Sequence, residues 1–139
     1  MPKYWIAIAS REHVQKGVEG SFAQVCHGKK SALGRMKKDD WIIYYSSKEF
    51  FSSSVLCQKF TAIGKVTDDT IYSFDMGEGF IPFRRNITFY PCEEVSILPL
   101  IETLEFIQNK KHWGYPFRYG LVEIGENDFL AIKNSMLKK

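Results

Sequence analysis

The neighbouring residues that could supply a nucleophile and a base are Cys26 and His27. Nucleophilic catalysis needs a thiolate, an imidazole and an orienting group that meet in space. Adjacent side chains of an extended loop point apart, so this pair does not form a dyad by itself. A metal site needs further ligands, and His13 and His112 form no ligand-spaced pair. We therefore expect no catalytic residue, no metal and no cofactor. A hydrolase that uses Cys26 or His27 stays an alternative, which would require activity lost on mutation of either.

A second candidate is Gly28-Lys29-Lys30-Ser31, which is similar to the end of a phosphate-binding loop. The full motif needs a glycine five residues before Gly28, where this sequence has Ala23. A nucleoside triphosphate site is therefore excluded. Gly28 still permits close approach of a ligand to the backbone, and Lys29 and Lys30 precede an expected helix start, where anions are favoured.

Aromatic residues crowd the segment 113–119, which reads Trp113-Gly114-Tyr115-Pro116-Phe117-Arg118-Tyr119. Its glycine and proline disfavour a regular helix or strand. Aromatic rings on such a loop either cap the hydrophobic core or stack on a planar ligand, such as a flipped base. The sequence leaves both interpretations open.

Basic residues are unevenly distributed, although the net charge is only +3. Segments 26–38, 79–92 and 106–122 contain no Asp or Glu, yet they hold ten of the 19 Lys and Arg residues. A basic face interleaved with aromatic rings is typical of nucleic-acid binding. Within these segments, Arg84 and Arg85 point to opposite sides of an expected strand. We expect one to contact phosphate and the other to pair with a carboxylate; a plain surface pair is the alternative.

The elements that must position these residues follow from the hydrophobic pattern. Apolar and alternating runs predict strands over 4–9, 41–45, 58–67, 70–76, 85–90 and 121–124. Helices are predicted from a Ser10 cap to Gly17 or Gly20, over 31–38, over 98–109, and after a cap at Asn127 or Asp128. Strands and short helices without a regular βαβ alternation indicate one α+β domain over residues 1–139, centred on a small barrel or curved mixed sheet.

Length and composition agree with a single globular domain. The chain has 139 residues, of which 45% are hydrophobic and 15% aromatic. Its longest apolar run, 4–9, is too short to span a bilayer, which needs about 20 residues. Three widely spaced cysteines (Cys26, Cys57 and Cys92) fit a reducing compartment. We expect a cytoplasmic protein without membrane association.

Taken in order along the chain, these pieces resemble the EVE family (UPF0310), within the PUA-like superfamily that includes the YTH readers of methylated adenine. The matching pieces are Tyr4-Trp5-Ile6, the loop from Gly20 to Leu33, Asp40 to Ser46, Gln58 to Val66, Phe80 to Arg85, Pro99-Leu100-Ile101, Phe106-Ile107 and Trp113 to Arg118. Two positions depart from the family's pattern, with Asp40 in place of Gly and Ser47 in place of Pro.

The resemblance implies a PUA-like small mixed β-barrel flanked by short helices. It also implies a pocket that accepts a modified nucleobase, a modified cytosine or similar, from DNA or RNA, without catalysis. We expect such a module to act as a monomer.

Carried onto this sequence, the resemblance places one set of residues in the base pocket and another along the phosphates. The base pocket would include Ser21, Phe22, Ala23, Gln24, Tyr45, Ser46 and Trp113, with Gln24 and Ser46 reading the base edge. Lys29, Lys30, Arg84, Arg85 and Arg118 would hold phosphates. The competing hypothesis is a small-molecule or protein-interaction module that uses the same pocket.

Overall fold

The computed structural model describes residues 2–137, apart from the side chain of His27, and is built on one seven-stranded mixed sheet. The strands pair in the order β2-β5-β4-β3-β1-β7, and β6 pairs with β4. Their bounds are β1 Tyr4–Ile8, β2 Phe22–Ala23, β3 Trp41–Lys48, β4 Leu56–Ser73, β5 Phe83–Phe89, β6 Val95–Ser96 and β7 Leu121–Ile124. β1 and β3 run parallel, and the other pairs are antiparallel.

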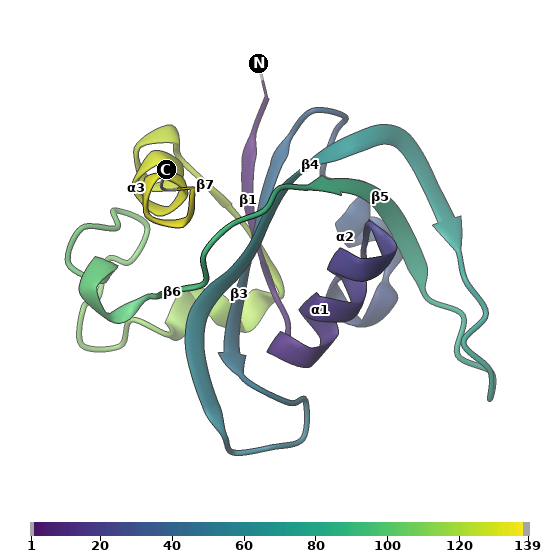
Figure 1. Ribbon diagram of the computed structural model, residues 1–139, viewed down its shortest axis with the longest axis horizontal. Coiled ribbons are helices and arrows are strands. Elements are labelled where there is room, and N and C mark those ends of the chain that lie inside the picture. The colour runs from purple at the N-terminus through teal and green to yellow at the C-terminus, as the bar shows by residue number, and fades with distance from the viewer. Residues whose placement is uncertain (1, 138–139) are drawn as a thin grey trace.

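β3 is the central strand, and its apolar run is explained by burial on both faces. Ile42 and Tyr44 belong to one hydrophobic cluster, whereas Ile43 and Tyr45 belong to another. Figure 1 shows helices α1 (Arg11–Gly20) and α2 (Lys30–Leu33) on one side of the sheet and α3 (Glu126–Met136) on the other. Because each face is covered, a strand of this sheet needs no polar alternation.

β4 is a single strand of 18 residues, so the prediction of separate strands over 58–67 and 70–76 was wrong. Its register on β5 shifts between Val66 and Ile71, which face Ile87 and Arg85. Such an irregularity bends a strand without ending it. Gly64 allows β4 and β5 to approach closely, because a Cβ there would lie 2.6 Å from the Thr88 carbonyl oxygen.

The helix predicted over 98–109 does not form. Only a 3₁₀ turn, η2 (Leu98–Leu100), is present, followed by irregular turns. The reason is a distant side chain: the Asp128 carboxylate accepts the backbone N–H groups of Glu105 (2.7 Å) and Phe106 (2.8 Å). These backbone donors are therefore satisfied outside a helix. Asp128 was also expected to cap α3, but that helix begins after Gly125.

Two other helix predictions differ in outcome. Ser10 caps α1 as predicted, since its Oγ accepts the backbone N–H of His13 at 3.3 Å. α2 ends at Leu33, well short of the predicted 31–38. Its remaining expected residues form turns, and the Leu33 and Met36 carbonyls accept Arg85 Nη1 instead.

The fold is α+β, and its strand pairings form a curved mixed sheet whose end strands are β2 and β7. They do not by themselves establish the closed small barrel. Within residues 2–137, no helix has the length and apolar character needed to cross a membrane.

Candidate nucleic-acid interface

An open pocket of about 370 Å³ lies at the carboxyl ends of β1 and β3. These two strands are parallel, and their last register pair is Ile8 with Tyr45. Parallel strands end at the same edge of a sheet, so their terminal side chains meet there. The pocket is lined by Ile8, Tyr45, Ser47, Lys48, Leu56, Gln58, Trp113, Gly114, Phe117 and Arg118.

The pocket has an aromatic wall. The ring of Tyr45 stacks on Phe117 with centroids 4.2 Å apart and an interplanar angle of 21°, and Phe60 contacts Tyr45 edge-on. Tyr45 is almost fully buried, and burial raises the pKa of its hydroxyl well above the usual range. Trp113 is half-buried and packs against the same cluster. Phe117 of the aromatic loop thus joins the core, and Trp113 lines the pocket, whereas stacking of a planar ligand on this loop stays a prediction.

Arg118 supplies an oriented cation at the rim. Its guanidinium carbon lies 3.7 Å from the ring centroid of Tyr115 and 5.3 Å from that of Tyr119. Its Nη2 donates to the Tyr119 hydroxyl at 3.1 Å, and this hydrogen bond lowers the pKa of Tyr119. All three side chains are exposed. A planar cation stacked on aromatic rings suits contact with a phosphate or a base.

The loop at 21–24 forms a separate cluster and does not line this pocket. Ser21 ends α1 in the left-handed conformation (φ 58°), and Ala23 is fully buried. The Arg84 guanidinium lies between the rings of Phe22 (3.9 Å) and Phe74 (4.0 Å). Gln24 Oε1 accepts Arg84 Nε at 3.0 Å.

Ser46 is also turned away from the pocket. It is fully buried, and its hydroxyl hydrogen bonds to that of Thr61 at 2.9 Å. Neither Ser46 nor Gln24 therefore presents its polar group to the pocket at the end of β3. The neighbouring polar side chains that do line it, Ser47 and Gln58, were missed because their positions follow from strand pairing.

Arg85 is buried in the protein, and it is the arginine of the pair that has the expected carboxylate partner. It is 3% exposed, and its Nη atoms donate to the carbonyls of Leu33, Met36 and Asp68. The expected carboxylate partner is Asp69, at 3.5 Å. Burial and these internal partners leave Arg85 no access to a phosphate.

Lys29 and Lys30 are exposed, and Lys30 Nζ lies 5.6 Å from the ring centroid of Phe83. Gly28 (φ +79°) was expected to approach a ligand, but a Cβ there would overlap Pro82. The close contact between Gly28 and Pro82 is therefore part of the internal packing of the protein. Nearby, the Cys26 thiol donates to the Tyr119 carbonyl at 3.7 Å, so this loop abuts the 3₁₀ turn η3 (Tyr115–Tyr119) at the pocket's edge.

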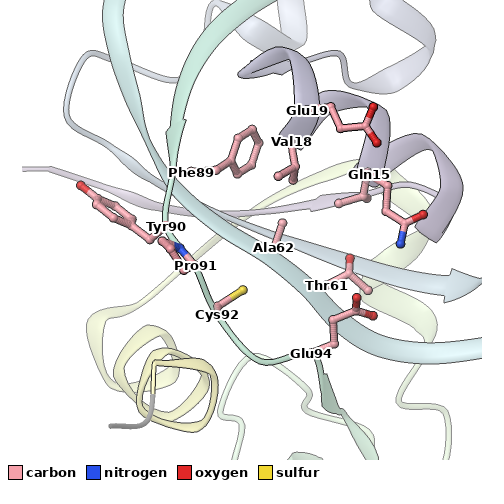
Figure 2. A pocket seen from close by; sticks show the side chains of 11 residues that line it. Gln15, Val18, Glu19, Thr61, Ala62, Phe89, Tyr90, Pro91, Cys92 and Glu94 are labelled. Atoms are coloured by element: carbon pink, nitrogen blue, oxygen red, sulfur yellow. The ribbon is translucent and has the colours of Figure 1, made fainter.

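A second pocket, of about 490 Å³, lies between α1 and the sheet. Figure 2 shows the side chains of α1 facing those of β4 and of the segment that follows β5. Its lining residues are Val14, Gln15, Val18, Glu19, Thr61, Ala62, Phe89, Tyr90, Pro91, Cys92 and Glu94. Arg11 holds Glu94 through two hydrogen bonds of 2.7 and 3.0 Å. Among the described residues, the lining carries carboxylates and no lysine or arginine, which disfavours a phosphate backbone there.

Cys57 is expected to react slowly with alkylating agents. Burial and a hydrogen bond to Glu49 raise the pKa of its thiol to about 11, so the reactive thiolate is scarce at neutral pH. Iodoacetamide at pH 7 should modify Cys57 about tenfold or more slowly than a free cysteine thiol. The rate, followed by peptide mass spectrometry, should rise as the pH approaches the raised pKa. Rapid modification of Cys57 at pH 7 would contradict a raised pKa of its thiol.

The structure describes the side chains of residues 2–137 except that of His27. Among these side chains, no three His, Cys, Asp or Glu residues are placed to hold a metal ion together.

Comparisons with known proteins add a family and a fold. The model of the EVE domain matches residues 3–135. The chain is 54% identical over 129 residues to the UPF0310 protein in the gntR 5′ region of Bacillus licheniformis, which covers 93% of this chain and 88% of that protein. It is 47% identical over 133 residues to the UPF0310 protein YdcG of Bacillus subtilis, with 96% and 91% covered.

Two solved structures share the fold at low sequence identity. They are the NMR structure of Rpa0253 from Rhodopseudomonas palustris (13% identical) and the crystal structure of Atu2648 from Agrobacterium tumefaciens (15% identical). Each superposition has a TM-score of 0.57 and covers 94% of this chain and 90% of the solved chain.

Proposed function

Because the chain belongs to the EVE domain family, we propose that it binds nucleic acid and reads a modified nucleobase without catalysing a reaction. The base occupies the pocket at the ends of β1 and β3 and is a modified cytosine or a similar base. Family membership also supports describing the curved sheet as a small PUA-like barrel that presents this pocket. The module acts in the cytoplasm as a monomer.

The observation that carries this proposal is the pairing of an aromatic wall with a cationic rim. The pocket volume of about 370 Å³ falls in the range of sites for small planar ligands. Trp113 offers a partly exposed ring on which a base stacks, and the Tyr45–Phe117 stack holds the wall in place. The base edge is read by Ser47, Gln58 and backbone groups, since Gln24 and Ser46 use their polar atoms internally.

Phosphates are held by exposed cations beside the pocket. Arg118 and Lys48 belong to its lining, and Lys29 and Lys30 extend the basic surface.

The test is a binding panel of short oligonucleotides, modified and unmodified, as DNA and as RNA, at two salt concentrations. Preferential binding of a modified-cytosine oligonucleotide, weakened steeply by salt, is the expected result. Equal affinity for modified and unmodified strands would argue against base reading, and no binding to any strand would overturn the proposal.

Arg118→Gln is expected to reduce the salt dependence of oligonucleotide binding. One lost phosphate contact should lower the slope of log affinity against log salt by about one unit or slightly less. Lys16→Gln, which removes an exposed charge on α1 outside the pocket, should leave the slope unchanged. Equal slopes for the wild type and the Arg118 variant would remove Arg118 from the phosphate-binding set.

The second pocket favours one alternative function, the binding of a small molecule. It is larger than the first, and Glu19 and Glu94 at its lining suit a neutral or cationic ligand. A free base or amine bound there should show little salt dependence, unlike an oligonucleotide. Calorimetry with free modified nucleobases at both salt concentrations separates the two functions.

A further inference from the structure

The turn between β3 and β4 continues the wall of the base pocket. Lys48 and Leu56 form the last register pair of these two strands, and both line the pocket. The intervening loop, residues 49–55, therefore starts at the pocket's edge. Figure 1 shows this loop extending beyond the end of the sheet.

The loop has a defined shape that presents a phenylalanine at its tip. The Ser53 N–H donates to the Phe50 carbonyl at 3.3 Å, so Phe51 is the second residue of a four-residue turn. The Glu49 N–H donates to the Val55 carbonyl (3.0 Å), and the Val55 N–H donates to Ser53 Oγ (2.9 Å). Phe51 is 77% exposed, more than any other large apolar residue among those described.

The base of the loop is anchored to α1, and its charge is suited to a polyanion. The Glu12 N–H donates to the Glu49 carbonyl at 3.0 Å, and Arg11 pairs with the Glu49 carboxylate at 3.5 Å. Glu49 is the one acid in the loop, and this pairing offsets its charge. Lys48 and Arg118 at the pocket lining are both exposed. The loop that carries the apolar tip thus starts at a cationic rim.

Resting on the proposed function, we propose that Phe51 is a wedge that enters a base stack when the neighbouring base flips into the pocket. Removing a base from a duplex leaves a gap whose refilling competes with base binding. An apolar side chain inserted at that step keeps the gap open. A single strand has no such gap opposite a paired partner. The wedge therefore identifies the preferred substrate as a duplex.

The experiment compares Phe51→Ala with wild type on two probes: a short DNA duplex with one 5-methylcytosine beside 2-aminopurine, and the same modified strand alone. Phe51→Ala should weaken duplex binding about tenfold and single-strand binding by less than about twofold. Fluorescence of 2-aminopurine should rise when wild type binds the duplex, because the neighbouring stack opens, and not when Phe51→Ala binds. Phe51→Leu should retain most of the duplex affinity, since its side chain is still an apolar wedge.

The matched control is Phe80→Ala. Phe80 is 45% exposed and ends a turn at the β4–β5 hairpin, where its N–H donates to the Gly77 carbonyl. It lines neither pocket, so both probes should bind its variant as they bind wild type.

Three results would overturn the wedge. Equal losses on duplex and single strand would make Phe51 a general stacking surface. Unchanged duplex binding, with self-association or capture of a protein lost in Phe51→Ala, would make the loop a protein interface. Failure of wild type to bind either probe, in DNA or in the matching RNA, would count against the proposed function, and the wedge would fall with it.

Discussion

Asp40→Asn is expected to lower the free energy of unfolding by about 2–4 kcal/mol, although the two side chains have the same shape. Asp40 is 2% exposed, and its carboxylate accepts three N–H groups. Oδ1 accepts the Lys3 N–H, and Oδ2 accepts both Trp5 Nε1 and the Lys37 N–H, each at 2.9 Å. Whichever way an amide is turned, its NH₂ must face at least one of these donors.

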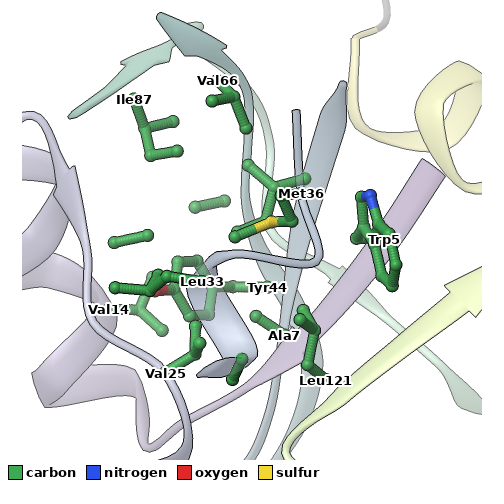
Figure 3. Close-up of a cluster of buried hydrophobic side chains, with 14 residues drawn as sticks. Trp5, Ala7, Val14, Val25, Leu33, Met36, Tyr44, Val66, Ile87 and Leu121 are labelled. Atoms are coloured by element: carbon green, nitrogen blue, oxygen red, sulfur yellow. The ribbon is translucent and has the colours of Figure 1, made fainter. Parts of the chain in front are cut away.

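The consequence reaches the hydrophobic core through Trp5. Figure 3 shows Trp5 at one side of the cluster of buried side chains between α1, α2 and the sheet. Its indole N–H is buried, so losing the acceptor leaves a desolvated donor. Urea unfolding measures the change. Asp39→Asn is the matched control, since exposed Asp39 (φ 73°) occupies a conformation that Asn tolerates, and it should stay within about 0.5 kcal/mol. Equal stability of the two variants would show that the three-donor site contributes little.

Trp113→Ala is expected to weaken binding of a modified-base oligonucleotide by about 1–3 kcal/mol, through lost stacking. Trp113 is half-buried, with part of its side chain packed on the core and part facing the pocket. A fully buried tryptophan would cost about 3–5 kcal/mol of stability on truncation, so a partly exposed one should cost clearly less. Melting temperature and oligonucleotide affinity, measured on the same variant, test both expectations.

Trp41→Ala is the matched control for that experiment. Trp41 is also half-buried, but it lies at the start of β3 and packs against Tyr90 and Phe129. Its truncation should reduce stability and leave the affinity of the folded fraction within about twofold, because Trp41 lines neither pocket. A large drop in melting temperature for Trp113→Ala, with affinity kept in the folded fraction, would make Trp113 a core residue and move base stacking to other rings.

The sequence by itself predicted the elements whose signals are local. The apolar runs at 4–9 and 41–45 became β1 and β3, and Ser10 caps α1. The order of the short motifs also sufficed to identify the family, which the match over residues 3–135 confirms. The strand and cap signals depend on residues a few positions apart, and the family match depends on the order of motifs along the chain, so no contact between distant segments was needed to interpret them.

Only the tertiary structure decided which candidate side chains are available to a ligand. Gln24 and Arg84 are 60 residues apart in the sequence and form a side-chain hydrogen bond with each other. The Asp128 carboxylate accepts the backbone N–H groups of Glu105 and Phe106, which lie in a segment whose local sequence favours a helix. A polar side chain can bind a ligand only where no internal partner already uses it, and such partners are set by packing between distant segments. For the same reason, Tyr45 meets the segment that carries Trp113 and Arg118 only through tertiary contacts. The Ile8 N–H donates to the Gly120 carbonyl at 2.9 Å, and the Tyr45 ring stacks on Phe117.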